Sequence, residues 1–206
     1  METLDALGKQ EAEENRRAAE RNEWSSGLSF RRTVFASVGI CLATACVGWL
    51  STASNTLLVL GSFGSSCVLL FAYPRSPFSR PRNFVAGHFI SSLVGLSFLH
   101  AVGPQWWAMA LATGTAFAAM MITRTIHPPA GSNPLIVYLS SADWSFVWMP
   151  TLLGALVIQA VACAHHFAQQ RVQLRLEENP ARRGTGNRLF VVLAARLAQF
   201  RRSSSR

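Results

Sequence analysis

The sequence predicts an all-α fold: a polytopic transmembrane helical bundle of six spans, arranged as two inverted three-helix repeats with broken helices. Three observations predict this class. Half of the 206 residues are hydrophobic and only 14% are charged, against about 25% in a typical soluble domain. Apolar runs long enough to cross a bilayer recur along the chain, and the arginines gather at the ends of these runs. A water-soluble domain of this length needs a charged surface, so we expect the chain to lie in a membrane.

The positions of the charges exclude several function classes. Between Trp24 and Leu176 the only acidic residue is Asp143. The net charge of +9 is also found in nucleic-acid-binding proteins, but basic residues at the ends of apolar runs are typical of topology signals, so we expect no nucleic-acid partner. No nucleophile–base pair, carboxylate pair or metal-ligand cluster is visible, so the sequence predicts neither an enzyme nor a cofactor.

The four cysteines support neither a metal site nor a disulfide framework. They lie inside apolar runs without CxxC spacing, and we expect them to be small packing residues. They are Cys41, Cys46, Cys67 and Cys163.

Residues 1–32 form a polar segment that we place on the cytoplasmic side. The part from Met1 to Glu23 is strongly acidic, which argues against both a cleaved signal peptide and an organellar transit peptide. The first apolar run is therefore expected to act as an uncleaved signal anchor.

Five apolar segments have the length of a spanning helix, roughly 17–25 residues. They are Thr33–Ala53, Thr56–Tyr73, Phe84–Val102, Gln105–Thr123 and Phe146–Phe167. A further segment, Ile126–Ala142, is apolar but short, and three prolines interrupt it.

The positive-inside rule favours a crossing by this broken segment. If residues 33–168 cross six times with the N-terminus inside, every loop arginine is cytoplasmic, and Asp143 faces the opposite side. Residues 169–206 then form a basic cytoplasmic tail. Five crossings with a re-entrant fifth segment is the competing interpretation. Within the tail, Leu189–Phe200 is apolar on one side, and an interfacial helix and an unstructured segment remain alternatives.

Two parts of the chain align with each other. The alignment places Gly64-Ser65 on Gly131-Ser132, and with the same offset it places Gly87 on Gly154. Three spans per half is an odd number, so the two halves are expected to be inverted relative to each other, which is a common transporter plan.

Each half then contains a Gly-Ser kink that precedes a short apolar helix inside the membrane. Such a helix start has unpaired N–H groups and a partial positive charge, which suit an anion in a protein-lined cavity. The alternative is that Gly and Ser only allow close helix packing. The side chains expected to add hydrogen bonds are Ser62, Ser65, Ser66, Ser132 and Asn133.

The stretch TRTIHPPAGSNPL, residues 123–135, closely resembles the HPP family of small integral membrane proteins. Residues 61–83 and 87–95 resemble two further hallmarks of that family. The resemblance covers roughly Thr33 to Phe167 and departs at Asn133-Pro134, where the family more often has small residues. It implies transport, because members in plastids and cyanobacteria are associated with nitrite transport.

The residues around the HPP motif are the candidate site. Pro129 suits the first turn of a helix, and Pro128 keeps His127 out of the helical region, at the mouth of the helix. There an imidazole can contact an anion or carry a proton with it, and a structural cap is the alternative. Arg124 either attracts anions or reaches lipid phosphate. His88 is an ionisable group inside a span, which indicates either function or a hydrogen-bonded packing role.

The expected function is a transporter or channel-like carrier for a small inorganic anion, nitrite first. The alternative is a non-transporting membrane scaffold or sensor module. The expected host is a plasma or inner membrane, or a plastid envelope in a photosynthetic eukaryote. Besides the anion and the lipid bilayer, a homo-oligomeric partner is compatible with six short spans. The predicted substrate-binding residues are His127, Pro128, Pro129, Gly131, Ser132, Gly64, Ser65, His88 and Arg124.

Overall fold

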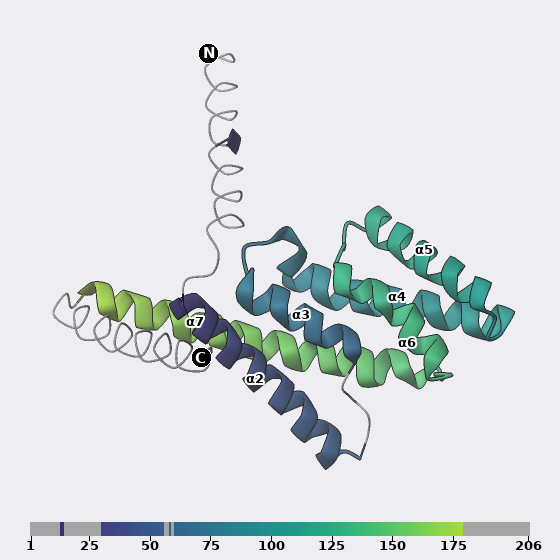
Figure 1. The fold of residues 1–206 in the computed structure, drawn as a ribbon, viewed down its shortest axis with the longest axis horizontal. Coiled ribbons are helices and arrows are strands. Elements are labelled where there is room, and N and C mark those ends of the chain that lie inside the picture. The colour runs from purple at the N-terminus through teal and green to yellow at the C-terminus, as the bar shows by residue number, and fades with distance from the viewer. Residues whose placement is uncertain (1–12, 15–29, 56–57, 59, 179–206) are drawn as a thin grey trace, which may run out of the picture.

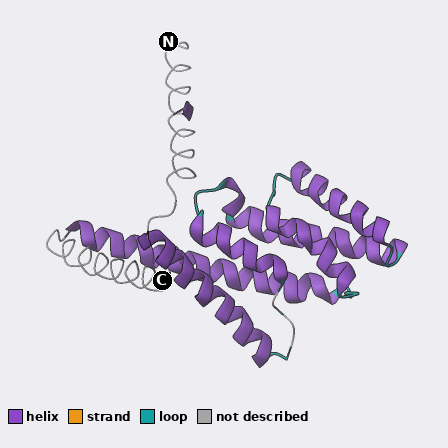
Figure 2. Ribbon diagram, viewed as in Figure 1, coloured by secondary structure: helices purple, strands orange, loops and turns teal. Residues whose placement is uncertain are grey.

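The computed structural model describes residues 13–14, 30–55, 58 and 60–178. Every regular element among these residues is helical (Figure 2), which confirms the all-α prediction for them. The predicted interfacial helix over Leu189–Phe200 and most of the N-terminal segment lie outside the described residues.

Within the described part of the chain, three helices are long and apolar enough to cross a membrane: Arg32–Ala53, Pro81–Val102 and Val147–Val172. The first belongs to α2 (Phe30–Ala53), the second is α4 (Pro81–Val102), and the third joins the π-helical turn η3 (Val147–Leu152) to α7 (Leu153–Glu178). At 1.5 Å per residue, 22 residues reach the roughly 30 Å of the hydrocarbon layer. The chain is therefore an integral, multi-pass membrane protein. Helix α7 continues to Glu178, well into the segment predicted as tail.

Three further segments are shorter. They are α3 (Gly61–Ala72), α5 (Trp106–Ile122), and the 3₁₀ turn η2 (Pro128–Ser132) with α6 (Asn133–Leu139). The last pair is the broken helix that the three prolines predict, and prolines occupy the first positions of both parts, where their missing N–H groups do not matter.

In the second predicted segment, Thr56–Tyr73, the described helix is α3, which covers the second part of the segment. Helix α3 has 12 residues and begins at Gly61, so the kink predicted at Gly64-Ser65 is wrong, and Gly64 lies in the first turn of a regular helix. The chain before it is extended at Leu60, with φ −100° and ψ 141°. The N–H of Leu58 donates to the hydroxyl of Ser51 at 3.1 Å, which ties Leu58 to the end of α2.

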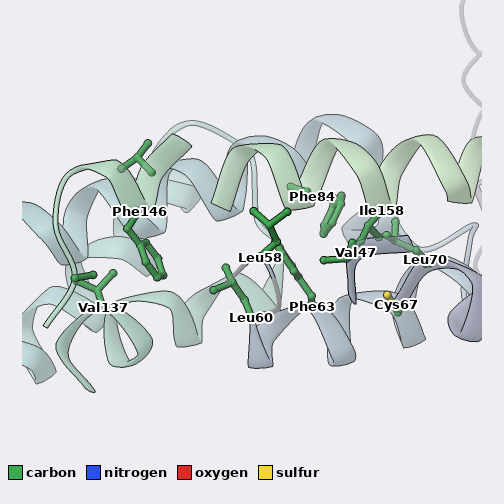
Figure 3. Packing of buried hydrophobic residues seen from close by; sticks show 14 of the residues in the cluster. Val47, Leu58, Leu60, Phe63, Cys67, Leu70, Phe84, Val137, Phe146 and Ile158 are labelled. Atoms are coloured by element: carbon green, nitrogen blue, oxygen red, sulfur yellow. The ribbon is translucent and has the colours of Figure 1, made fainter. Parts of the chain in front are cut away.

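Two of the shorter helices, α3 and α6, lie inside the bundle, and α5 lies on its outside. Helix α2 packs across α7, and α5 packs along α4, while α3 and α6 lie between them (Figure 1). The core runs from Val137 and Phe146 at one end through Leu58 and Phe63 to Ile158 (Figure 3). Large apolar side chains on the outer helices are exposed, as expected for a protein solvated by lipid; examples are Val38, Leu42, Leu111 and Phe117.

Candidate functional site

A chain of buried polar side chains crosses the centre of the bundle. Helix α4 presents Phe84, His88, Ser91, Ser92 and Gly95 as buried residues. Their spacing of three and four residues places them along one stripe of the helix. That stripe faces η2 and α6. Polar groups of α4 therefore meet residues 125–139, here called the HPP segment, inside the bundle.

Ser66 on α3 joins the two histidines. Its Oγ lies 2.9 Å from Nε2 of His88 and 2.9 Å from Nε2 of His127. Both imidazoles are 0% exposed, and so is Ser66. The same Oγ lies 2.9 Å from the carbonyl oxygen of Ser62, one turn earlier on α3.

The far nitrogen of His127 is held by a backbone group. Its Nδ1 lies 2.8 Å from the carbonyl oxygen of Phe78, in the 3₁₀ turn η1 (Pro77–Ser79). A carbonyl oxygen only accepts, so Nδ1 carries a hydrogen and donates it. The turn itself is fixed because the hydroxyl of Ser79 donates to the carbonyls of Leu69 and Tyr73 at the end of α3.

On the other side of Ser66, Nδ1 of His88 extends the row of hydrogen bonds towards α6. This nitrogen lies 3.0 Å from the amide nitrogen of Asn133. The same amide nitrogen donates to Oγ of Ser92 at 2.9 Å, and Ser92 is 3.0 Å from the hydroxyl of Thr151. Asn133 and Thr151 are both 0% exposed. The chain of hydrogen bonds therefore links η1, α3, α4, α6 and η3.

Aromatic rings enclose the two imidazoles. The ring of Phe84 meets His88 and His127 edge-on, with centroids 5.1 Å apart in each case. Phe63 meets His88 in the same way at 5.0 Å. The two imidazole centroids are 5.2 Å apart. The pair thus packs against two phenyl rings, those of Phe63 and Phe84.

Gly87 lets the HPP segment approach α4. A Cβ at this position would lie 2.9 Å from Cβ of His127 and 3.0 Å from the carbonyl oxygen of Thr125. His127 has φ −134° and ψ 100°, which confirms that the residue before the two prolines lies outside the helical region. Its backbone therefore crosses α4 closely enough for the side chain to reach Ser66.

The structure brings together only part of the predicted substrate-binding set. His88 and His127 meet, but Ser65 donates to the carbonyl of Ser62 at 3.0 Å, and Ser132 donates to that of Pro129 at 2.8 Å. These are local bonds within their own turns. The two serines do not join the polar chain.

The remaining predicted residues lie around the site rather than in it. Pro128 is exposed and Pro129 half-buried in the first turn of η2, and Arg124 is exposed in the turn after α5, with φ 56°. A Cβ at Gly64 or Gly131 would meet no atom within 4 Å. The alternative of close helix packing is therefore not supported at these two glycines, whereas a close approach does occur at Gly87.

Several residues of this hydrogen-bonded network were not among the predicted substrate-binding residues. Ser66 and Asn133 were expected only as additional hydrogen-bonding groups, and Ser92, Thr151 and the Phe78 carbonyl were not expected at all. One signal was available: the alignment of the two halves places Ser66 on Asn133, so a polar side chain recurs at the same repeat position.

Comparison with known proteins relates this chain to transmembrane proteins. The family model described as "HPP, transmembrane region" matches residues 25–174. A transmembrane protein of Dictyostelium discoideum is 35% identical over 126 residues, which are 57% of this chain and 40% of the relative. A second transmembrane protein of that organism is 33% identical over 123 residues, 55% of this chain and 43% of the relative.

The chain thus spans less than half the length of the two relatives. No solved structure matches it significantly. The family match covers most of the chain and includes the histidine pair, Ser66 and Asn133. The chain therefore belongs to the HPP family of transmembrane proteins.

Proposed function

We propose that this protein is a secondary transporter or channel-like carrier for a small inorganic anion, nitrite first. The observation that carries the proposal is the pair His88 and His127, bridged by Ser66 and fully buried among apolar helices. Ionisable side chains inside a membrane are costly and commonly mark the path of an ion.

The chemistry around the pair favours an anion over a cation. The hydrogen bonds of the two rings go to Ser66, Asn133 and the Phe78 carbonyl, and none of these groups is charged. Among the described residues between Phe30 and Val172, the only carboxylate is that of Asp143, which is exposed after α6. A metal cation would require several negatively charged oxygens. Imidazole, hydroxyl and amide groups can all donate to an anion.

The geometry of the two halves supports the inverted repeat and the six crossings that go with it. The alignment that places Gly64 on Gly131 also places the bounds of α3 on Pro128 and Leu139, the first residue of η2 and the last of α6. Both halves therefore contain a short element of the same extent, each next to long helices of the other half.

Close contacts recur at equivalent positions as well. A Cβ at Gly87 would lie 3.0 Å from the carbonyl of Thr125, and one at Gly154 would lie 3.2 Å from the carbonyl of Leu58. The same alignment relates both the glycines and the carbonyl groups. The histidine site then lies where the two halves meet, as is typical of transporters built from inverted repeats.

The proposal extends to the setting of the protein. We place it in a plasma or inner membrane, with no enzymatic activity and no nucleic-acid partner. A homo-oligomer remains compatible with the small volume that the helices enclose.

The test is nitrite flux into liposomes that contain the purified full chain, with protein-free liposomes as the baseline. We expect His127→Ala to reduce the flux roughly tenfold or more, because a hydrogen bond to a charged group contributes about 1.5–3 kcal/mol. The matched control is His100→Ala on the same membrane domain. His100 is exposed and stacks on Trp144 outside the polar chain.

Two results would contradict the proposal. Equal nitrite flux through wild type and a correctly folded His127→Ala variant would exclude the role of His127. Wild-type protein that inserts and folds but moves neither nitrite nor another small anion would favour the scaffold or sensor function.

A further inference from the structure

We infer that His127, Ser66 and His88 form a binding site for one proton, and that this proton is the coupling ion of the transporter. The second half of this inference rests on the proposed function. The first half rests on two complete hydrogen-bonding patterns that the same atoms support, one without and one with an additional proton.

With both rings neutral, the partners support one complete pattern of hydrogen bonds. Nδ1 of His127 donates to the Phe78 carbonyl at 2.8 Å, so its Nε2 accepts from the hydroxyl of Ser66. Ser66 has one hydrogen, so its oxygen accepts from Nε2 of His88. Nδ1 of His88 then accepts from the amide nitrogen of Asn133, 3.0 Å away. All the bonds point in one direction, from Asn133 to Phe78.

An additional proton on His127 gives a second complete pattern. Nε2 then carries a hydrogen and donates it to the oxygen of Ser66. The hydroxyl hydrogen of Ser66 turns to the carbonyl of Ser62, 2.9 Å away, and the Ser66 oxygen accepts from both imidazoles. A hydroxyl has two lone pairs and one hydrogen, so it fills either role. No group of the pair loses its partner in either state.

Uptake and release of the proton form and break only one covalent bond. A proton from water forms an N–H bond with the lone pair of Nε2 on His127, and that bond breaks when the proton returns to water at the other face. The ring gains and then loses one positive charge. No oxidant, reductant or second reactant takes part.

The pair holds one additional proton rather than two. The ring centroids are 5.2 Å apart in a buried, apolar site, where two positive charges would repel strongly. The other titratable side chains of the neighbouring elements make no hydrogen bond to either ring. Among the residues whose side chains the structure describes, they are Cys67 on α3, Arg75 and Arg80 beside η1, Arg82 and His100 on α4, Arg124 after α5, Tyr138 on α6, and Cys163, His165, His166 and Arg171 on α7.

The arginines Arg80 and Arg82 at the start of α4 and Arg124 after α5 are all exposed. Arg82 is exposed and donates to the carbonyl of Thr123 at 3.0 Å, and Arg124 is exposed in the following turn. Neither provides a fixed positive charge at the rings. The charge of the site therefore depends on protonation of the histidine pair.

The hydrogen-bonded network that holds the site starts near one surface of the bundle. It begins at Phe78, 37% exposed in the turn between α3 and α4, and reaches Ser92 and Thr151. Ser92 lies eleven residues after Pro81, about 16 Å along α4, which is about half the length of that helix. The chain thus extends from the loop to mid-membrane.

Coupling to a proton lowers the desolvation penalty of moving an anion through this site. An isolated charge in an apolar interior carries a large desolvation penalty, and a paired charge a much smaller one. The imidazolium supplies the opposite charge only when the proton is bound. Anion and proton together cross as a neutral pair.

The proton site is tested by isotope-edited infrared difference spectroscopy of the full chain in lipid, recorded between two pH values with labelled histidine. We expect an imidazolium signal that is lost in His127→Gln. Its midpoint should shift in Ser66→Ala and stay unchanged in Ser65→Ala, because the hydroxyl of Ser65 bonds only within its own turn. If His127→Gln does not fold, the two serine variants still assign the signal. A histidine signal that neither His127→Gln nor Ser66→Ala alters would overturn the inference.

The coupling is tested in liposomes with the membrane potential clamped and a pH-sensitive dye inside. An inward nitrite gradient should drive nitrite and protons inward together in a fixed ratio, above the level of protein-free liposomes. In His127→Gln, proton movement should fall to that baseline. Nitrite flux without accompanying protons would overturn the coupling and leave the proposed function intact. Absence of nitrite flux would refute the proposed function and with it the coupling, while the infrared result still decides whether the proton site exists.

Discussion

At the scale of single residues, two adjacent serines on one helix have different roles. Ser66 is fully buried and its hydroxyl lies within 2.9 Å of two imidazoles and a carbonyl. Ser65 is exposed and bonds only to the carbonyl of Ser62. The difference arises because adjacent helical residues point about 100° apart, so only one of them faces α4.

We expect Ser66→Ala to lower the free energy of unfolding by about 1–3 kcal/mol, because it leaves buried imidazole nitrogens without a partner. Ser65→Ala should change it by less than about 0.5 kcal/mol. Thermal or denaturant unfolding of both variants in one detergent measures the difference. Equal losses would show that Ser66 is not the bridge.

At the scale of elements, small residues on α4 determine how closely the HPP segment approaches that helix. A Cβ at Gly95 would lie 2.9 Å from Cα of Pro134, and one at Gly87 would lie 2.9 Å from Cβ of His127. The hydroxyl of Ser91 donates to the carbonyl of Ala130 at 2.6 Å between them. Small residues and a short hydrogen bond thus bring two backbones together, as is common between membrane helices.

Gly87→Ala and Gly95→Ala should each destabilise the protein by about 1–3 kcal/mol, since the added methyl group overlaps neighbouring atoms that have little room to move. Both should also reduce anion flux by separating His127 from Ser66. Gly114→Ala on α5 is the matched control, because a Cβ there meets no atom within 4 Å. This change should be neutral or stabilising by up to about 1 kcal/mol. A control variant as unstable as the other two would indicate a general effect of alanine rather than a close contact.

At the scale of the whole molecule, the arrangement of charge orients the bundle. Arg75, Arg80 and Arg82 lie in or next to the turn between α3 and α4, whereas Asp143 lies in the loop after α6. With six crossings, these two loops face opposite sides of the membrane, in agreement with the positive-inside rule.

Labelling of single cysteines with a membrane-impermeant reagent tests this topology. Positions 55, 80 and 143 are exposed, and the background lacks the four native cysteines. Cysteines at 55 and 143 should react from one side of the membrane and a cysteine at 80 from the other. Reaction of positions 80 and 143 from the same side would exclude six crossings.

The sequence by itself determined the class of the protein. Composition and run length predicted apolar helices, and the long helices α2, α4 and η3–α7 fall on the predicted segments because about 20 apolar residues have few alternatives to a membrane helix. The prolines predicted the broken fifth segment. His88 was predicted as a site residue because it is an ionisable side chain inside a span. These signals are local: each depends on residues close together in the chain.

Only the tertiary structure decided which residues form the site. Ser66 and Ser65 look alike in the sequence, and so do Gly87 and Gly64, yet one member of each pair contacts a residue of the HPP segment and the other does not. The contact between Ser66 and His127 spans 61 residues of chain. It depends on where α3 begins and on how closely α4 approaches the HPP segment. The start of α3 at Gly61 rather than at the predicted kink sets the helix face that Ser66 presents, and no local pattern specifies that rotation.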